Sequence, residues 1–174
     1  RTDQLHYLTA MQTNAFQGRQ MYQKVMDEPC NSFANGDQTS TMIRTVKGKT
    51  ILIQHNVMTP RPYSRMFQAV GTQGYAAKYP VAEVLLTAEA AAKVGIALDH
   101  SNVPLSASQI ETLLKHYAPA FPSAAINLAK QLDPRGGMSY FMDLRLAQCL
   151  QQGLPLDMDV YDLAEWCCIA ELSK

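Results

Sequence analysis

The chain has 174 residues, of which 47% are hydrophobic and 17% are charged, a composition that fits one globular domain with a sizeable core. Its 15 basic and 15 acidic residues cancel and form no positive stripe, which argues against nucleic acid as a partner. No apolar run in the sequence approaches the roughly 18 residues that a membrane span requires.

The first forty residues predict a strand, a short helix and a loop. Side chains alternate in QLHYLTAMQT (residues 4–13), which predicts a half-buried strand. The face expected to be buried carries Leu5, Tyr7, Thr9 and Met11. The stretch GRQMYQKVMDEP (residues 18–29) predicts a short helix or an irregular segment that proline ends, and NSFANGDQ (residues 31–38) predicts a loop.

The clearest local signal is a hairpin in TSTMIRTVKGKTILIQHNV, residues 39–57. Two β-branched runs flank a Lys-Gly pair, and glycine supplies the positive φ that a tight turn needs. The two-residue period of a strand places Thr41, Ile43 and Thr45 on one face. Residues 64–80 predict a further strand, a glycine turn and a short returning strand.

Helical patterns dominate the second half of the chain. Residues 81–95 fit either a strand followed by a helix or one helix that ends at a glycine. Further helices are predicted over residues 105–118, 122–132, 139–153 and 159–174. Ser106 and Gln109 form a capping box at the first of these, and Asp159 is the expected N-cap of the last.

Strands first and helices afterwards predict an α+β fold, a mostly antiparallel β-sheet with helices on one face. The other sheet face would then be open and would meet a partner subunit or another part of a longer chain. The sequence begins at Arg1 rather than at a methionine, and we interpret it as a segment of a longer protein. Any targeting peptide would lie upstream, so these residues leave the compartment unknown.

The stretch TPRPYSR, residues 59–65, is the best candidate for a site. Its two prolines fix φ at about −65° and extend the residues before them, so the segment is stiff. It would present Arg61, Tyr63 and Arg65 in fixed directions. A phenol beside guanidinium groups ionises more easily and donates well to sugar hydroxyls or a carboxylate. The simpler alternative is a connection between strands with solvated arginines.

Other reactive side chains suggest no second site. His55 ends a hairpin strand and is interpreted first as packed or hydrogen-bonded. The four histidines and four cysteines have no metal-ligand spacing, so no metal site and only free thiols are expected. The aspartates of LPLDMDVYD (residues 154–162) could form paired carboxylates, but helix capping is the simpler account. No G-x-G-x-x-G, P-loop or G-x-S-x-G motif occurs.

Three stretches together resemble the C-terminal domain of glycoside hydrolase family 109. They are RTDQLHYLTAM at the start, NGDQTSTMIRTVKGKTILIQHNVMTPRPYSRMFQAVGTQGYAAKYP, and GGMSYFMDLRLAQCLQQGLPLDMDVYDLAEWCCIAELS. The family belongs to the Gfo/Idh/MocA oxidoreductase superfamily, and its best-known activity is α-N-acetylgalactosaminidase. Residues 81–134 match it only loosely.

The resemblance implies that residues 1–174 form one C-terminal substrate-binding and oligomerisation domain, whose N-terminal Rossmann domain is absent from this sequence. That domain would bind NAD, so no cofactor is expected on the fragment, which would be inert alone. In the family a sugar hydroxyl is transiently oxidised, which acidifies the neighbouring C–H and permits elimination of the glycoside. Tyr63 matches the family's substrate-site tyrosine and is expected to bind sugar or to act as acid or base, with Arg61 and His55 as substrate-binding supports. A homo-oligomer through the open sheet face and a carbohydrate or glycoside substrate are also implied.

The sequence departs from the family pattern at three positions. The family reads Gln-His-Asp where this chain has Gln54, His55 and Asn56, and Arg135 and Ser139 replace a histidine and an aspartate. Substrate choice is therefore expected to differ, or hydrolysis to be lost. Two alternatives stay open: a domain of an NAD(P)-dependent sugar or cyclitol dehydrogenase, and a non-catalytic assembly and carbohydrate-recognition module. Exported relatives suggest a periplasmic parent, and a cytoplasmic one stays open.

Overall fold

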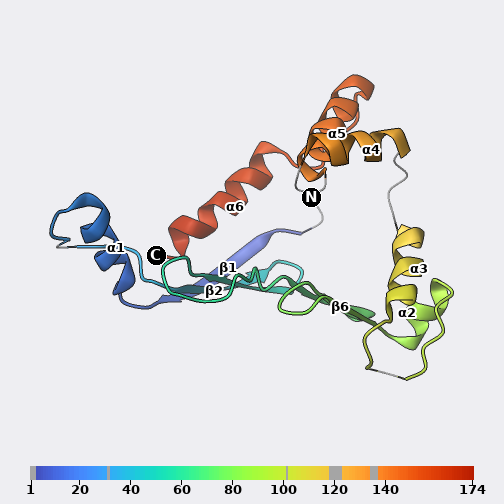
Figure 1. The fold of residues 1–174 in the computed structure, drawn as a ribbon, viewed down its shortest axis with the longest axis horizontal. Coiled ribbons are helices and arrows are strands. Elements are labelled where there is room, and N and C mark those ends of the chain that lie inside the picture. Colours follow the sequence, from blue (N-terminus) through green and yellow to red (C-terminus); the bar gives the residue numbers. More distant parts are fainter. Residues whose placement is uncertain (1–2, 31, 101, 118–122, 134–136) are drawn as a thin grey trace. The chain divides into compact units, whose positions relative to one another are not determined.

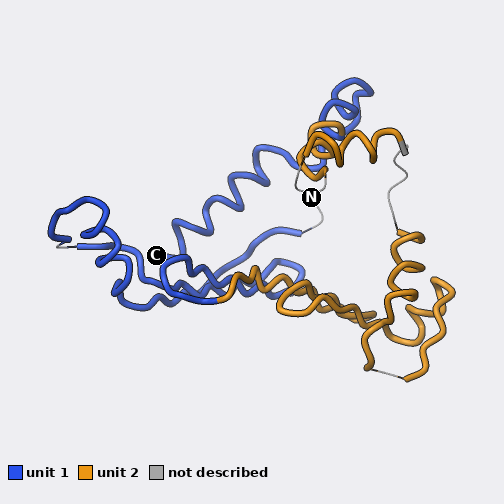
Figure 2. Tube along the Cα trace, viewed as in Figure 1, with its two compact units in different colours: residues 1–61, 145–174 blue, residues 62–144 orange. Residues whose placement is uncertain are grey.

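The computed structural model describes residues 3–30, 32–100, 102–117, 123–133 and 137–174. In these residues the chain forms two three-stranded antiparallel sheets and six helices, an α+β fold as the sequence predicts (Figure 1). The chain divides into two compact units (Figure 2). Unit 1 contains residues 1–61 and 145–174, and unit 2 contains residues 62–144.

The strands precede most of the helices along the chain, as the sequence predicts. In chain order they are β1 (Leu5–Gln12), α1 (Gln17–Met26), β2 (Thr39–Thr45), β3 (Thr50–His55), β4 (Gln68–Val70), β5 (Gly74–Ala77), β6 (Glu83–Leu86), α2 (Ala88–Lys93), α3 (Ala107–Tyr117), α4 (Ser123–Leu132), α5 (Met138–Gln152) and α6 (Val160–Leu172). None of the helices in the described ranges combines the length and the apolar character that crossing a bilayer requires.

Sheet A lies in unit 1 with the strand order β1-β2-β3, and its β2–β3 hairpin forms as predicted. Gly48 adopts a φ of +82°, and its N–H donates to the carbonyl of Thr45 at 3.0 Å. Ile43 is 2% exposed, whereas the adjacent Met42 is 61% exposed. The sheet therefore has one covered and one open face, because successive side chains of a strand point to opposite sides.

Helix α6 lies on the covered face of sheet A (Figure 1). The Thr41 hydroxyl donates to the Ser173 hydroxyl oxygen at 2.9 Å in a buried hydrogen bond. The backbone N–H of Leu5 donates to the Glu165 carboxylate at 2.6 Å. These bonds join residues far apart in the sequence, so they fix where the helix lies, which no local pattern specifies.

The prediction that Tyr7, Thr9 and Met11 belong to the buried face of β1 is wrong, because all three are exposed. The side chains of Tyr7 and Met11 are 61% and 78% exposed. The pairing of β1 with β2 shifts register between Leu5 and Tyr7, and a one-residue shift moves every following side chain to the other face. Leu8 and Ala10 therefore share the covered face, opposite the inward residues of β2.

Sheet B lies in unit 2 with the order β4-β5-β6, and residues 81–95 form a strand followed by a helix. Thr87 separates the two elements because its hydroxyl oxygen accepts from the N–H of Ala90 and caps α2. The core of this unit is a cluster of four buried side chains. They are Ala91, Val94, Ile96 and Leu105.

Both predicted helix caps are confirmed. The N–H of Ser106 donates to the Gln109 side-chain oxygen at 2.8 Å, and the N–H of Gln109 donates back to the Ser106 hydroxyl at 3.4 Å. At α6, Asp159 and Asp162 form the reciprocal capping box, each accepting from the other's backbone N–H. The carboxylates of residues 154–162 that the sequence also allows as a catalytic pair therefore serve in capping at these two positions.

Candidate functional site

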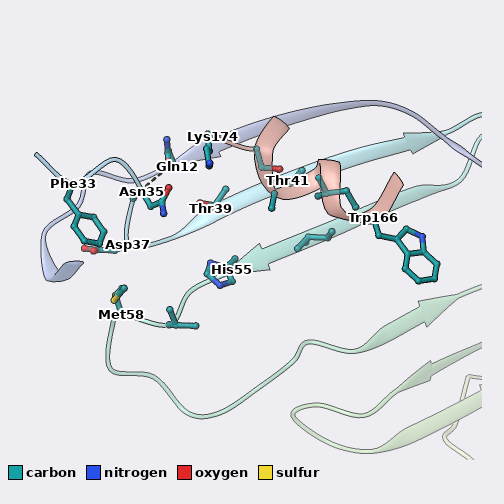
Figure 3. A pocket seen from close by; sticks show the side chains of 16 residues that line it. Gln12, Phe33, Asn35, Asp37, Thr39, Thr41, His55, Met58, Trp166 and Lys174 are labelled. Carbon is teal, nitrogen blue, oxygen red and sulfur yellow. Dashed lines mark hydrogen bonds between the residues drawn. The ribbon is translucent and has the colours of Figure 1, made fainter. Parts of the chain in front are cut away.

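A pocket of about 440 Å³ lies in unit 1, and its lining comes from sheet A, α6 and the loops beside them. Figure 3 shows His55 near its middle, Phe33 and Met58 toward one end, and Trp166 toward the other. His55 ends β3 on the covered face, where it pairs in register with Thr39. The structure therefore places this predicted site residue in a concave site, which its sequence context does not reveal.

Asp37 fixes the loop at one edge of this pocket. Its carboxylate accepts hydrogen bonds from the backbone N–H groups of Phe16, Gln17 and Gly18, each at 2.9 Å. These N–H groups at the start of α1 have no partner within the helix, and the side chain of its N-cap residue, Phe16, makes no capping hydrogen bond. The N–H donors, that of Gln17 first, hold the pKa of Asp37 below its ordinary value.

Arg61 does not join the pocket. It is exposed, does not line the pocket, and makes no hydrogen bond or ion pair with another residue of the described ranges. It lies in unit 1 at the boundary with unit 2, whereas Tyr63 lies in unit 2. The three residues predicted to share a site therefore have three different environments.

Tyr63 belongs to a small cluster with Arg65 and Tyr79. Arg65 Nε–H donates to the Tyr63 phenol oxygen at 2.6 Å, and the Arg65 guanidinium carbon lies 6.0 Å from the centre of the Tyr63 ring. The ring of Tyr79 meets that of Tyr63 edge to face, with centroids 5.9 Å apart. Tyr63 is nevertheless 71% exposed, so its hydroxyl can reach a ligand.

Sheet B brings this phenol–guanidinium cluster together. Tyr63 and Arg65 precede β4, and Tyr79 follows β5, the antiparallel partner of β4. The pairing continues past the strand ends because the N–H of Lys78 donates to the carbonyl of Phe67 at 2.9 Å. Tyr79 is a member that sequence reasoning missed, and the predicted return of this strand was the signal that could have found it.

The hydrogen bond to Tyr63 raises the pKa of the Arg65 guanidinium above its ordinary value, so this side chain remains a cation. A cation that donates to the phenol oxygen occupies one acceptor direction of that oxygen. The phenol proton must then point away from Arg65. The cluster can therefore present a fixed O–H donor, or exchange a proton, with an acceptor outside the protein.

The structure describes two of the three positions that depart from the family pattern, Asn56 and Ser139. The Asn56 side-chain oxygen accepts from the N–H and the hydroxyl of Thr59, at 3.2 and 2.9 Å, which braces the turn before the proline segment. The N–H of Ser139 donates to the Asp133 carboxylate at 2.8 Å at the start of α5. Arg135 lies outside the described residues.

The described part of the chain contains no cluster of side chains suited to binding a metal ion, and its cysteines form no disulfide. No group of three or more His, Cys, Asp or Glu side chains there could hold a metal ion. The four cysteines are free thiols, as predicted. Asp157 forms a two-bond ion pair with Arg145, at 2.9 and 3.0 Å, which lowers the pKa of this carboxyl group and ties α5 to the loop before α6.

Comparison with known proteins identifies similar sequences over the whole chain. A family model described as "Glycosyl hydrolase 109, C-terminal domain" matches residues 1–174. The chain is 49% identical to Glycosyl hydrolase family 109 protein 1 of Bacteroides fragilis and 49% identical to a family 109 protein of Porphyromonas gingivalis. It is 47% identical to protein 1 of Bacteroides thetaiotaomicron. All of this chain is aligned in each case, but it spans 38% of the length of these relatives.

Proposed function

We propose, because the chain belongs to the glycosyl hydrolase 109 C-terminal domain family, that it is the substrate-binding domain of an NAD-dependent, sugar-active enzyme. In this proposal the longer protein cleaves a glycoside with redox assistance. Residues 1–174 by themselves are expected to be inert, because they supply sugar-binding and acid–base groups rather than a nucleotide site.

The phenol–guanidinium cluster is the observation that carries this proposal. A sugar hydroxyl or a glycosidic oxygen is a hydrogen-bond acceptor, and Tyr63 offers an exposed phenol whose oxygen is held at 2.6 Å by Arg65. Arg65 acts as a positioning residue, because it contacts the phenol oxygen and fixes the direction in which the proton points. His55 and Arg61 stay predictions as substrate-binding supports.

The start of α1, the helix that follows β1, does not fit a dinucleotide. A pyrophosphate is usually held by the N–H groups at the start of a helix that follows a strand, with glycine allowing close approach. Helix α1 follows β1, but the carboxylate of Asp37 already occupies those donors and would repel an anion. In this proposal NAD binds to a part of the longer protein outside residues 1–174.

One assay separates this function from its two alternatives. The longer protein with NAD should release free sugar from an aryl glycoside without net formation of NADH. Net NADH formation with free sugars would instead favour a sugar or cyclitol dehydrogenase. Sugar binding with neither activity would favour the assembly and recognition module and would contradict the proposal.

We also propose that the open face of sheet A is a homo-oligomer interface. Exposed apolar side chains cluster on it, since Tyr7 and Met11 of β1, Met42 of β2 and Leu52 of β3 are each at least 60% exposed. Met42→Lys should place a charge in the middle of this face and convert an oligomer into monomers. Sedimentation velocity measures the change, and Leu114→Lys, at a 61% exposed position of α3, is the control. An unchanged sedimentation coefficient for Met42→Lys would exclude this face.

A further inference from the structure

We infer that the unit 1 pocket, the 440 Å³ pocket between sheet A and α6, is a binding site for a neutral small molecule with a bicyclic aromatic body and a hydroxyl group. Pockets that hold drug-sized ligands typically have volumes of about 300–1,000 Å³, so this one is large enough for two fused rings and a short substituent. All residues of this pocket belong to unit 1, and the site would use His55 to orient the ligand hydroxyl in place of its predicted role in sugar binding.

Most of the pocket lining is apolar, and much of it is suited to aromatic rings. Phe33 and Trp166 offer ring surfaces, and Met58 offers a thioether that packs well against a ring. Ile53 and Ile169 add aliphatic surface from β3 and α6. An aromatic body would bury apolar area against those of these side chains that it contacts, which is the main source of affinity in such pockets.

The charged side chains of the lining already have partners, which favours a neutral ligand. Its lining contains one acidic residue, Asp37, and one basic residue, Lys174, besides His55. The carboxylate of Asp37 already accepts three backbone N–H groups. The ammonium group of Lys174 contacts both carboxylate oxygens of Glu171, at 2.9 and 2.8 Å. A charged ligand would lose its hydration without gaining an unpaired counter-charge, so charge should weaken binding.

A few neutral polar groups can orient a hydroxyl. His55 and Asn35 line the pocket, and their side chains form no hydrogen bond with another residue of the described ranges. The Thr41 hydroxyl, in contrast, is used in its bond to Ser173. One or two hydroxyl groups can therefore be satisfied, whereas a sugar ring, polar around its whole edge, would leave several hydroxyls unpaired against apolar walls.

The sequence contains a single tryptophan, so the pocket carries its own reporter. In a ¹⁵N-labelled chain, the indole N–H of Trp166 gives one resonance. We would titrate 2-naphthalenemethanol, its anionic counterpart 2-naphthoate, and N-acetylgalactosamine as a sugar. The alcohol should shift the indole resonance saturably, and the carboxylate and the sugar should bind about ten-fold more weakly or worse.

Two alanines of α6 provide a matched pair of variants. Ala170 lines the pocket, whereas Ala164 is exposed on the same helix and does not line it. Ala170→Leu should fill part of the volume and weaken binding of the alcohol by about ten-fold, and Ala164→Leu should leave it unchanged. Equal effects of the two variants would overturn the inference. The inference would also be overturned if the alcohol did not shift the indole resonance, or if the carboxylate or the sugar bound as tightly as the alcohol. These titrations use the unchanged chain, so they do not depend on whether a variant folds.

Discussion

Replacing Tyr63 by phenylalanine in the longer protein that carries this domain should lower turnover of an aryl glycoside by about ten-fold or more. The change keeps the ring that packs edge to face on Tyr79 and removes the oxygen that accepts from Arg65. The domain should therefore fold unchanged while losing the proton that the phenol directs toward the substrate. Steady-state kinetics with NAD present measure kcat and KM separately.

The control is Tyr117→Phe, because Tyr117 lies in the same unit and is 69% exposed, against 71% for Tyr63. It should leave both kinetic constants unchanged. A loss confined to KM would assign Tyr63 to sugar binding alone, since uniform binding affects ground state and transition state equally. An unchanged kcat/KM for Tyr63→Phe would remove this residue from the site and withdraw the observation on which the proposed function depends.

The Asp37→Asn variant should lower the melting temperature of residues 1–174 by about 5 °C near neutral pH. Asparagine keeps the size of the side chain but removes its charge and one acceptor oxygen. The N–H groups of Phe16, Gln17 and Gly18 would then be incompletely paired at the start of α1. Because Asp37 also fixes the loop at the pocket edge, the variant should loosen that loop.

The pH dependence of this difference gives a second measurement on the same variant. The pKa of Asp37 is lowered from its ordinary value of 3.8 in the folded chain. The unfolded state therefore binds a proton first as the pH falls, so the stabilisation is complete well above 3.8 and is lost as the pH drops through the folded-state pKa. The difference in melting temperature between wild type and Asp37→Asn should thus be constant near neutral pH and shrink in acid.

Asp99→Asn is the control for this experiment, since Asp99 is exposed and makes no hydrogen bond or ion pair within the described ranges. Its melting temperature should follow that of the wild type across the whole pH series. If Asp37→Asn melted like the wild type near neutral pH, the carboxylate would not be the group that holds the start of α1. The assignment of its lowered pKa to these N–H donors would then be wrong.

Local chemistry determined most of the elements from the sequence alone. The hairpin turn at Gly48 and the capping boxes at Ser106 and Asp159 depend on residues within about one turn of each other, so their patterns are readable directly. The resemblance of several stretches to family 109 also identified the family that the whole-chain match shows. The α+β class followed from the order of these elements.

Sequence reasoning about candidate site residues succeeded only in part. The stiff proline segment directed attention to Tyr63 and to its neighbour Arg65, which the structure joins by a hydrogen bond. It did not identify Tyr79, which the pairing of β4 with β5 brings to the same ring. It also treated Arg61 and His55 as equal supports, although His55 lines a pocket and Arg61 does not.

What the sequence by itself determined is the set of helices and strands, their caps and turns, and the residue types available for chemistry. Only the tertiary structure decided which face of β1 is covered, where α6 lies and which side chains share a pocket. The face of β1 that is covered follows from the shift in register between β1 and β2. The position of α6 follows from the hydrogen bonds of Thr41 to Ser173 and of Leu5 to Glu165. They join residues that are distant along the chain, and the side chains of each segment alone do not specify which partner segment will bury them.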